Sequence, residues 1–423
     1  MKRIAVIGAG ISGMGAAYLL SRKHEVWLFE KEGRLGGHTH THPIETSCGV
    51  LPIDTGFIVH NDRTYPNLVR LFRRMGILRQ ASDMSFGVSC RQSGFEYSSR
   101  GLGGFFAGRS NLFRPGHYRF LAEIMRFNRE AKRLLHDPAS AEITLGDYLR
   151  ANGFAGDFTH YYLHPMAAAV WSTSPEEIED FPVFTLIRFL ENHGLLGLTT
   201  APQWYALKGG SSVYISPLTA PYRDRIRLEA KIDGVRRTAA GAEISFADTP
   251  PESFDEVVFA CHAPQTLQLL KDLTPLERQV LGGFRTSRNE TVLHTDSSLL
   301  PQRPAARASW NYHLGTHRRV ATLTYHMNRL QALPTRQDYC VTLNDTQSVD
   351  QRRVLREMTY FHPLYNLEAV RAQARWHEIS GRNRTHFCGA YWFYGFHEDG
   401  LNSAIRVAEK LGVAWDEPGE VAA

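Results

Sequence analysis

Apolar residues first gather in a short run at the start of the chain. Residues Lys2 to Ile7 read as a buried strand, Gly8 to Gly13 as a turn, and Met14 onward as a helix whose small and apolar residues face a sheet. A second apolar strand, EVWLFEK, follows the helix. This order of strand, turn, helix and strand predicts a parallel sheet with helices packed on it, so we expect an α/β fold.

In three later regions the apolar residues are spaced differently, as in further strands and a helix. Between 226 and 264, two alternating runs flank a glycine turn and precede an apolar run, which predicts a small antiparallel sheet and a return to the first sheet. The stretches SWNYH and VATLTYHMNRLQAL alternate as strands do. From 117 to 135, apolar residues recur at helical spacing, with basic residues on the other face. On this helix, the residues expected to face the protein core are Leu121, Ile124, Met125, Ala131, Leu134 and Leu135.

The turn after the first strand has glycines at functional spacing. Gly8 allows a tight turn, Gly10 lets the backbone approach a pyrophosphate, and Gly13 lets the helix pack close to the strand. Glu30 follows Gly10 by 20 residues and is placed to accept hydrogen bonds from an adenosine ribose. Both NAD and FAD satisfy this pattern. The dinucleotide-binding residues predicted here are Gly8, Gly10, Ile11, Ser12, Gly13, Glu30 and Lys31.

The residues after the second strand favour FAD. Arg34, Gly36 and Gly37 lie in KEGRLGGHTHT, where a second approach to the diphosphate is expected. Their order resembles the R-x-G-G-R motif of the flavin amine oxidase and phytoene desaturase superfamily, with His38 in place of the last arginine. The resemblance continues in a D-x-G segment at Asp54 and in WYALKGGSSVYISPL. It implies that the chain binds FAD.

The resemblance also implies a domain plan. A Rossmann-like FAD-binding domain of the amine oxidase type, similar to that of glutathione reductase, is expected to comprise residues 1–75, 201–268 and 384–423. A discontinuous α+β substrate domain is expected to comprise residues 76–200 and 269–383. The further cofactor-binding residues that the resemblance implies are Arg34, Gly36, Gly37, His38, Asp54, Thr55, Gly56, Phe57, Gly389 and, at the adenine, Ile232.

The stretch GAYWFYGFHEDGLNSA, which starts at Gly389, departs from the family pattern. Relatives follow this glycine with an acid that binds the ribityl chain, but here the next residue is Ala390. We expect Glu398 or Asp399 to supply the missing hydrogen bond, beside a helix whose amino terminus faces the flavin. A simple helix-cap role for Asp399 is the alternative. The predicted cofactor-binding residues at this helix start are Glu398, Asp399, Gly400, Leu401 and Asn402.

In such a fold the substrate gives a hydride to flavin N5, and the protein orients the reactants and excludes water. The stretches LHTDSSLLP, SWNYH and GFHEDG resemble bacterial flavoproteins described as NAD/FAD-binding. Those proteins are linked with cyclopropane-synthase-like methyltransferases and with the dehydrogenation of lipid acyl chains. The resemblance implies oxidation or desaturation of a membrane-lipid acyl chain, and a methyltransferase partner in the same pathway.

Two other functions stay open, a flavin amine oxidase acting on a soluble amine and a flavin-bound protein that binds a partner without turnover. Amine oxidases of the superfamily usually hold a lysine near N5, and the segment SRNETVLHTD offers none. His397 and Glu398 follow an aromatic run and are the predicted catalytic residues, removing a proton as the hydride leaves. The predicted substrate-lining residues are Trp171, Trp310, Tyr312, Trp392, Tyr394 and Phe396.

Charge and cysteine content bear on location and partners. The net charge of +5 is a small excess of 48 basic over 43 acidic residues, and we expect no nucleic-acid partner. Five scattered cysteines without a C-x-x-C pair indicate reduced thiols in the cytoplasm. The segment 99–135 is basic and rich in phenylalanine, which predicts contact with the inner face of a membrane. An ordinary helix with a solvated arginine face is the alternative.

Two kinds of chemistry are not expected. A second G-x-G-x-x-G after a strand is missing, which argues against an NADPH domain. The run HTHTH at 38–42 suggests zinc, but no acidic or cysteine partner stands at ligand spacing, so we expect no metal.

Overall fold

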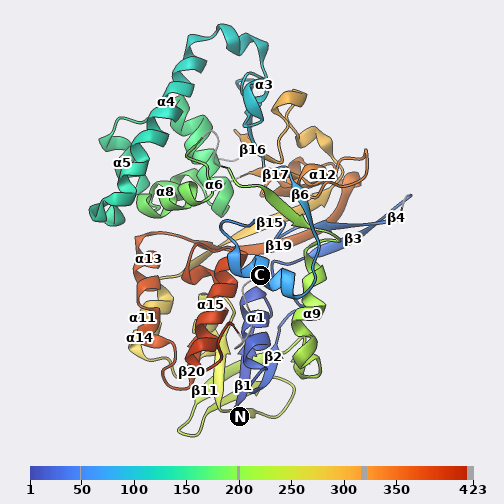
Figure 1. Ribbon diagram of the computed structural model, residues 1–423, viewed down its shortest axis with the longest axis vertical. Coiled ribbons are helices and arrows are strands. Elements are labelled where there is room, and N and C mark those ends of the chain that lie inside the picture. Colours follow the sequence, from blue (N-terminus) through green and yellow to red (C-terminus); the bar gives the residue numbers. More distant parts are fainter. Residues whose placement is uncertain (48, 198–200, 316–321, 417–423) are drawn as a thin grey trace.

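The computed structural model describes residues 1–47, 49–197, 201–315 and 322–416. Figure 1 shows a parallel sheet with its helices at one end of the long axis, and a second sheet with a helical lobe at the other. The parallel sheet includes both strands predicted near the start of the chain, and the expected α/β, Rossmann-like fold is confirmed. In sheet order its strands are β10 (Ile226–Arg227), β2 (Glu25–Phe29), β1 (Arg3–Ile7), β14 (Glu256–Phe259) and β20 (Thr385–Phe387).

Helices α1 (Ile11–Leu20) and α15 (His397–Lys410) lie side by side on this sheet (Figure 1). Glycines on both helices allow the approach. A Cβ on Gly400 would lie 2.6 Å from the Ile11 side chain, and one on Gly15 would lie 3.1 Å from Leu401. The amino terminus of α15, which follows the last parallel strand, is thereby placed beside the amino terminus of α1.

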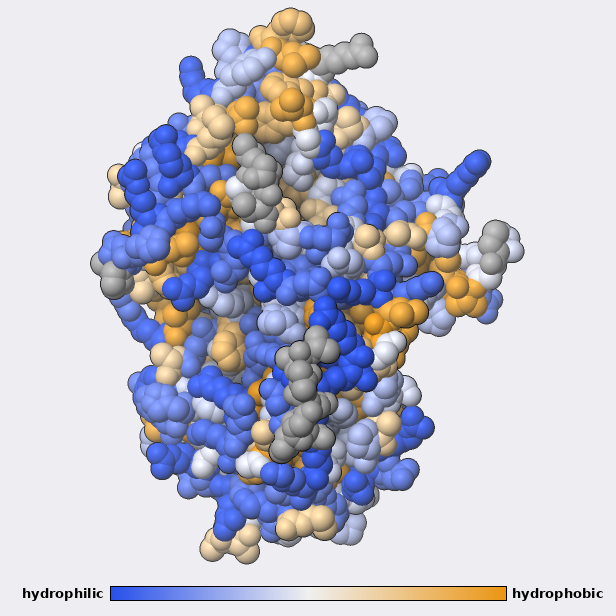
Figure 2. Space-filling view, viewed as in Figure 1, coloured by the Kyte–Doolittle hydropathy of each residue, from blue (hydrophilic) through white to orange (hydrophobic). Residues whose placement is uncertain are grey.

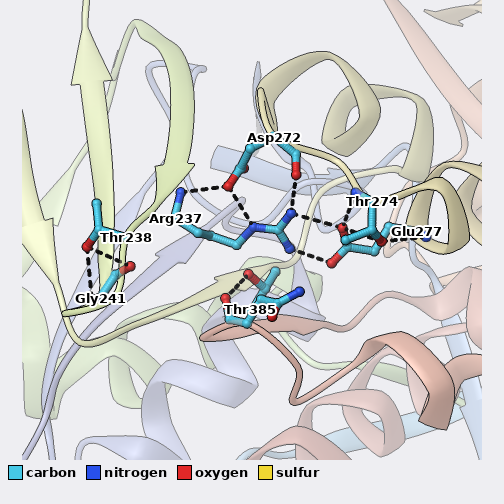
Figure 3. Close-up of polar contacts among 8 residues, drawn as sticks. Arg237, Thr238, Gly241, Asp272, Thr274, Glu277 and Thr385 are labelled. Carbon is cyan, nitrogen blue, oxygen red and sulfur yellow. Dashed lines mark hydrogen bonds and ion pairs between the residues drawn. The ribbon is translucent and has the colours of Figure 1, made fainter.

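A small antiparallel sheet covers one side of the nucleotide-binding unit, as predicted. Arg237 at its edge is buried against Glu277, with Nη1 to Oε1 and Nη2 to Oε2 at 2.5 and 3.0 Å. Its Nε also donates to Asp272 at 3.1 Å, so this guanidinium ties the small sheet to helix α11 (Figure 3). The elements are β11 (Ile232–Arg237), β12 (Ala242–Phe246), β13 (Glu252–Phe254), α10 (Ala263–Leu269), α11 (Pro275–Gly282), α13 (Leu367–Ala374) and α14 (Trp376–Ile379).

Helices α11, α13 and α14 pack into the same apolar core as the parallel sheet. Leu281, Ala372 and Trp376 belong to that core, together with Val6 and Val258 of the central strands. Their segments fall within 269–383, the range expected to be substrate domain. The predicted domain boundaries stay a prediction. These three helices pack on the nucleotide-binding unit.

The second sheet has seven strands drawn from both long insertions. Strand β16 pairs in parallel with β7, and the other neighbours in the sheet are antiparallel. The stretches SWNYH and LTYH are strands as predicted, but the chain turns into a short helix at Met327. In sheet order the strands are β19 (Val354–Leu364), β15 (Arg285–His294), β18 (Cys340–Leu343), β17 (Leu323–His326), β16 (Trp310–Leu314), β7 (Phe86–Cys90) and β8 (Phe95–Ser98).

The helical lobe packs above this sheet (Figure 1). Its longest helix, α4, buries Phe120, Ile124 and Phe127 at spacings of four and three. Met125, predicted to face the core, is instead 51% exposed, because the neighbouring phenylalanines take the inward positions. The helices are α3 (Gly101–Phe105), α4 (Pro115–Ala131), α5 (Leu145–Ala151), α6 (His164–Trp171), α7 (Pro175–Glu179) and α8 (Val183–Asn192).

Short elements join the two parts. In the described residues, no helix is both long enough and apolar enough to cross a membrane. The hairpin β3–β4 projects sideways in Figure 1. The remaining elements are β3 (Thr41–Thr46), β4 (Gly49–Asp54), β5 (Val59–Asn61), α2 (Pro66–Arg74), β6 (Arg79–Ser82), β9 (Trp204–Leu207), α9 (Ile215–Thr219) and α12 (Met327–Leu330).

Candidate functional site

The glycine turn lies at the carboxyl edge of the parallel sheet, where such sheets bind ligands. Gly8 has a left-handed φ of +104°, and a Cβ there would lie 3.0 Å from the carbonyl carbon of Ala260. A Cβ on Gly13 would lie 1.8 Å from the Gly8 oxygen, so the helix packs directly on the turn. Gly10 differs, because no atom of the described residues lies within 4 Å of the Cβ position. Its open side leaves room for a ligand.

The amino terminus of α1 and Glu30 border the same turn. Gly10 is the N-cap of α1 and brings no side chain to accept from the first helical amides, which therefore stay available to an anion. Glu30 Oε2 accepts from the amide of Ala9 at 2.8 Å, and Oε1 accepts from the amide of Glu32 at 2.9 Å. The glycine turn and Glu30 are thus brought together as predicted from their spacing.

Ile232 and Lys31 lie near Glu30 with different surroundings. The amide of Ala230 donates to the backbone oxygen of Glu30 at 2.8 Å, so Ile232 follows that contact by two residues. Lys31 is exposed, and its Nζ lies 3.5 Å from Glu32. Ile232 is therefore placed near the expected adenine end, while Lys31 has an acidic neighbour at the surface.

The loop after β2 packs on the glycine turn. The amide of Gly36 donates to the oxygen of Ala9 at 2.9 Å, and a Cβ on Gly37 would lie 3.1 Å from the Gly10 Cα. Arg34 donates to the backbone oxygens of Gly37 at 2.9 Å and Leu35 at 3.4 Å. The guanidinium therefore orders this loop from within, which is a different role from the predicted direct approach to the diphosphate.

His38 belongs to a cluster that sequence spacing did not reveal. Its ring stacks on Tyr360 at 5.2 Å and lies 5.3 Å from His362 and 6.2 Å from His262, measured between ring centroids. Burial, followed by the neighbouring histidines, holds the pKa of His38 well below its usual value, so the ring is neutral. Its buried Nε2 has no hydrogen-bond partner among the described residues. A neutral, unpartnered ring nitrogen therefore stands where relatives carry arginine.

His397 begins α15 and is held by three groups. Its ring stacks face to face on Phe57 at 3.8 Å, and Nε2 is hydrogen bonded to Thr39 Oγ1 at 2.8 Å. Tyr214 Oη lies 3.3 Å from the same nitrogen and 2.5 Å from Thr39 Oγ1. Burial, and then His60, lowers the pKa of His397 to about 3. At neutral pH the ring is therefore an uncharged, fixed hydrogen-bonding group.

Glu398 has a different role from the one predicted. Its Oε1 accepts from the amide of Asn67 at 3.0 Å and its Oε2 accepts from the amide of Leu68 at 2.8 Å. These amides lie in the first turn of α2, so Glu398 caps that helix from a distant part of the chain. Asn402 accepts from the Asn67 side chain at 2.8 Å. Because both of its oxygens hold the start of α2, we assign Glu398 to helix capping.

The contacts of Asp399 match the simpler of its two predicted roles, that of a helix cap. Its Oδ2 accepts from the amide of Phe396, the N-cap of α15, at 2.9 Å. Burial raises the pKa of this carboxyl to about 7. Asp399 therefore caps its own helix, and its side chain is committed to backbone amides near the site.

We expect Glu398→Gln to lower the free energy of unfolding by about 1 to 2 kcal/mol, because one of two capping acceptors becomes a donor facing an amide. The bound flavin should be retained, and urea unfolding together with the visible absorbance of the purified protein measures both. Glu409→Gln, an exposed change on the same helix, is the matched control. Unchanged stability with loss of flavin would instead return Glu398 to the cofactor site.

Asp54 is also committed to the protein. Both of its oxygens accept from the amide of Ser211, at 2.8 and 3.0 Å, and Oδ2 accepts from Gln331 at 2.9 Å. Thr55 is hydrogen bonded to Tyr360 at 2.7 Å, while the amide of Phe57 donates to the oxygen of His38 at 2.7 Å. The predicted D-x-G segment therefore joins the two parts of the chain and places Phe57 under His397. A Cβ on Gly56 would lie 2.0 Å from the same His38 oxygen.

The predicted substrate-lining residues separate into two groups. Trp392 packs edge to face on Phe284 at 4.8 Å in the core of the nucleotide-binding unit, and Tyr312 is buried in the core of the other part. Trp310 meets Tyr325 edge to face at 5.0 Å in the second sheet. Tyr312 and Trp392 are buried and Trp310 is partly buried, and their substrate-lining role stays a prediction.

The other three aromatic residues lie together. Trp171 donates from Nε1 to the oxygen of Tyr394 at 3.2 Å, and Phe396 stacks on Phe189 at 5.1 Å. Tyr394 and Phe396 line a cavity of about 390 Å³, shared with α2 and α8. His193, not predicted, stacks on Phe189 at 3.9 Å and lines the same cavity.

A further cavity, of about 850 Å³, lies at the opposite edge of the parallel sheet. Lys2 and Glu256, at the amino ends of β1 and β14, line it with His386 and Lys410. Ligands of open parallel sheets bind outside the carboxyl ends of the strands. The site therefore lies at the glycine turn and His397, in spite of the larger size of this cavity.

The arrangement fits FAD. The open side of Gly10 and the uncapped amides of α1 suit a pyrophosphate, and Glu30 suits a ribose. The unpartnered Nε2 of His38 is a buried polar group that needs a partner. Gly389 packs against the ring of Tyr391, and its amide donates to Ser403 at 2.8 Å. Among the described residues, no group of three or more histidine, cysteine, aspartate or glutamate side chains is arranged to hold a metal ion.

Several residues of this site were missed by local motifs. Thr39, Tyr214, His262, Tyr360 and His362 come from four segments far apart in the chain. Thr39 lies in the run HTHTH, which suggested metal binding, and Tyr214 lies in WYALKGGSSVYISPL, which suggested no contact with His397. Their convergence depends on the fold, because four separate segments bring them to the carboxyl edge.

Comparisons with known proteins agree with this geometry. Residues 11–289 match the family described as flavin containing amine oxidoreductase. A CLA-producing fatty acid isomerase from P. acnes has 14% identity and a TM-score of 0.69, covering 95% of this chain and 97% of the other. Putrescine oxidase bound to putrescine has 12% identity and a TM-score of 0.70, covering 97% and 98%.

A further structure has the same fold. A putative protoporphyrinogen oxidase from Exiguobacterium sp. 255-15 has 18% identity and a TM-score of 0.68, covering 97% of this chain and 98% of the other. A search of curated proteins returns no match. The family match covers more than half of the chain. The chain therefore belongs to the flavin containing amine oxidoreductase family and is an FAD-dependent oxidoreductase.

Proposed function

We propose that this oxidoreductase dehydrogenates an acyl chain of a membrane lipid. Two adjacent chain carbons lose a hydride and a proton and gain a double bond. FAD, when bound, accepts the hydride at N5. The observation that carries the proposal is that Asp54, Glu398 and Asp399, the carboxylates beside His397 in the part of the chain that the structure describes, are buried and already hydrogen bonded to the protein.

The carboxylates near the site are already occupied. Asp54 is saturated by Ser211, Thr41 and Gln331, and Asp399 caps its own helix. The neighbouring imidazoles of His38 and His397 are neutral, because burial lowers the pKa of each. An ammonium substrate would have to compete with these hydrogen bonds for the carboxylates, whereas an uncharged chain needs no counter-charge. This supports an apolar substrate over a soluble amine.

The aromatic wall supports the same class of substrate. Phe189 stacks on both His193 and Phe396, and the three rings line the cavity beside the amino terminus of α15, together with polar groups that include Glu398 and Asp399. Such rings bury apolar surface and exclude water. One protein of this fold is a fatty acid isomerase, so the fold accepts acyl-chain chemistry in that case. The expected methyltransferase partner in the same pathway remains a proposal.

The roles of Thr39, Phe57 and His397 follow from their contacts. Once the hydride has left, a hydrogen on the adjacent carbon is acidic, and a weak base is enough to accept it. A neutral imidazole can do this, and we assign the role to His397. Stacking on Phe57 and the hydrogen bond to Thr39 fix its ring while it does so.

Anaerobic bleaching of the flavin tests the proposal. Holoprotein is mixed with a panel of detergent-dispersed phospholipids and, separately, with a panel of primary and secondary amines. Bleaching by phospholipid alone, with a new double bond found in the acyl chain by mass spectrometry, is the expected result. Bleaching by an amine alone would replace the proposal with the amine oxidase alternative.

We expect His397→Gln to slow flavin reduction by about 100-fold or more, the size typical of losing a positioned acid or base. Glutamine keeps a hydrogen bond to Thr39 but cannot accept the proton. Stopped-flow absorbance under anaerobic conditions measures the rate. The exposed change His377→Gln is the control, and an unchanged rate in His397→Gln would remove the catalytic role.

A further inference from the structure

The end of the helical lobe exposes a group of large apolar side chains. We call residues 100–119 the tip. Leu102 is 77% exposed, Phe113 86%, Tyr118 49% and Leu112 46%. Figure 2 shows apolar atoms gathered at this end of the molecule. Single exposed apolar residues are ordinary in soluble proteins, but four within 17 residues form a patch that calls for an occupant.

The charged side chains that the tip itself contributes have one sign. From 97 to 122 the chain has four arginines and neither aspartate nor glutamate. Arg100, Arg114 and Arg119 are exposed. Of these, Arg100 has an acidic neighbour, Asp83, at 3.7 Å. Cationic side chains beside exposed apolar ones suit the anionic headgroups and the acyl boundary of a phospholipid bilayer.

Hydrogen bonds within the tip, and a ring contact with Phe120, hold the tip in place. His117 Nε2 is hydrogen bonded to the oxygen of Phe105 at 3.1 Å, and Tyr118 donates to the oxygen of Leu112 at 2.9 Å. The ring of Phe105 stacks on Phe120 at 5.8 Å, and Phe120 is buried. The polar ends of His117 and Tyr118 therefore fix the loop that presents Phe113. The exposed side chains project from an ordered base.

The structure narrows the segment predicted to contact a membrane. Of the five phenylalanines between 99 and 135, Phe120 and Phe127 are buried, and Phe105 and Phe106 are half-buried. Phe113 alone is fully outward. The carboxyl half of α4 packs through Ile124 and Phe127 into the lobe. The surface available to a bilayer is therefore the tip, while the rest of the segment is core and solvated helix.

We infer that the tip docks on the surface of a bilayer containing anionic phospholipid. Leu112 and Phe113 enter the acyl boundary, and Arg114 and Arg119 lie at the level of the headgroups. The choice of a bilayer over a protein partner rests on the proposed function, since an acyl-lipid substrate lies in such a surface. The opposite end of the molecule, with the parallel sheet, faces away from the membrane (Figure 1).

Flotation of the holoprotein with vesicles tests the inference. One set of vesicles is phosphatidylcholine alone and the other is phosphatidylcholine mixed with phosphatidylglycerol. We expect binding to the mixed vesicles, weakened by salt. The double variant Arg114→Gln/Arg119→Gln should lower the partition coefficient by on the order of tenfold or more, from the attraction of anionic lipid for each basic residue. Leu112→Ser/Phe113→Ser should abolish binding.

Two matched controls separate the tip from general surface effects. Phe361→Ser removes a phenylalanine that is 44% exposed on β19, and Arg352→Gln removes an arginine that is 89% exposed near the same strand. Both should bind vesicles as the unaltered protein does. Equal binding by the tip variants, or no binding by the unaltered protein, would overturn the inference. So would self-association in sedimentation that is lost in Leu112→Ser/Phe113→Ser, since the tip would then serve a second copy of the chain.

Failure of docking and failure of the proposed function give different results. Flotation needs no turnover, and the bleaching experiment uses lipid dispersed in detergent. Vesicle binding without bleaching by phospholipid would support docking through the tip and contradict the proposed acyl-chain substrate. Bleaching by dispersed phospholipid without vesicle binding would support the acyl-chain substrate and contradict docking through the tip.

Discussion

Gly10→Val is expected to yield a folded protein that has lost its FAD. Apart from its chain neighbours, no described atom lies within 4 Å of the Cβ position of Gly10, and its φ of −73° suits any residue, so we expect the protein to tolerate the added side chain. The added methyl groups instead fill the space beside the α1 amides, where the pyrophosphate fits. We expect FAD affinity to fall at least about 100-fold, equivalent to about 2.7 kcal/mol.

Titration of the apoprotein with FAD, followed by flavin fluorescence, measures this loss. Circular dichroism should show unchanged secondary structure, and the unfolding midpoint of the apoprotein should be close to that of the unaltered apoprotein. Gly282→Ala is the matched control, because Gly282 is equally open and lies on α11, away from the turn. If Gly10→Val kept its FAD, the pyrophosphate would not bind beside Gly10, and the proposed cofactor position would be wrong.

The parts of this site that are close in sequence were predictable. Gly8, Gly10 and Gly13 lie in the turn and the helix start after β1, and Glu30 directly follows β2, so their meeting follows from a single strand–helix–strand unit. The fold class follows from the same unit. Spacing alone identifies such a unit because each of its contacts is local or between adjacent strands.

The parts that depend on distant contacts were not predictable. Glu398 reaches α2 across 331 positions, and Asp54 reaches Ser211 across 157. Motif position suggested flavin contacts for both carboxylates, but backbone amides occupy them. The histidine cluster around His38 likewise forms only when β19 passes over the loop after β2. Sequence spacing carries no information about which amide a buried carboxylate will find.

Buried neutral histidines should make this protein unstable in mild acid. A histidine whose folded pKa lies below its unfolded value binds fewer protons in the folded state, so its contribution to stability is complete above about pH 6.5 and is lost as the pH falls towards the folded pKa. Burial lowers the pKa of His60 and of His294 to about 4, and both rings are fully buried. Burial also lowers, to about 3 or 4, the pKa of His193, His262, His313, His362 and His397.

Two buried acids act in the opposite direction. Burial raises the pKa of Asp54 to about 6 and that of Asp399 to about 7, so protonation of each favours the folded state as the pH falls. Two such groups offset about two histidines, and at least five remain. We therefore expect the free energy of unfolding to fall between pH 7 and pH 5, by up to about 2 kcal/mol for each histidine that is not offset.

His60→Phe tests this account at one residue. Neither ring nitrogen of His60 has a hydrogen-bond partner among the described residues, and the ring lies among Phe57, Phe72 and Tyr205. Phenylalanine keeps the aromatic packing and removes the titration. Urea unfolding at pH 8 and pH 5 should show the variant gaining about 2 kcal/mol over the unaltered protein at pH 5 relative to pH 8, because the packing change cancels between the two pH values. The exposed change His136→Phe should show no such difference. An equal effect of His60→Phe at both pH values would mean that this buried ring does not cause acid instability.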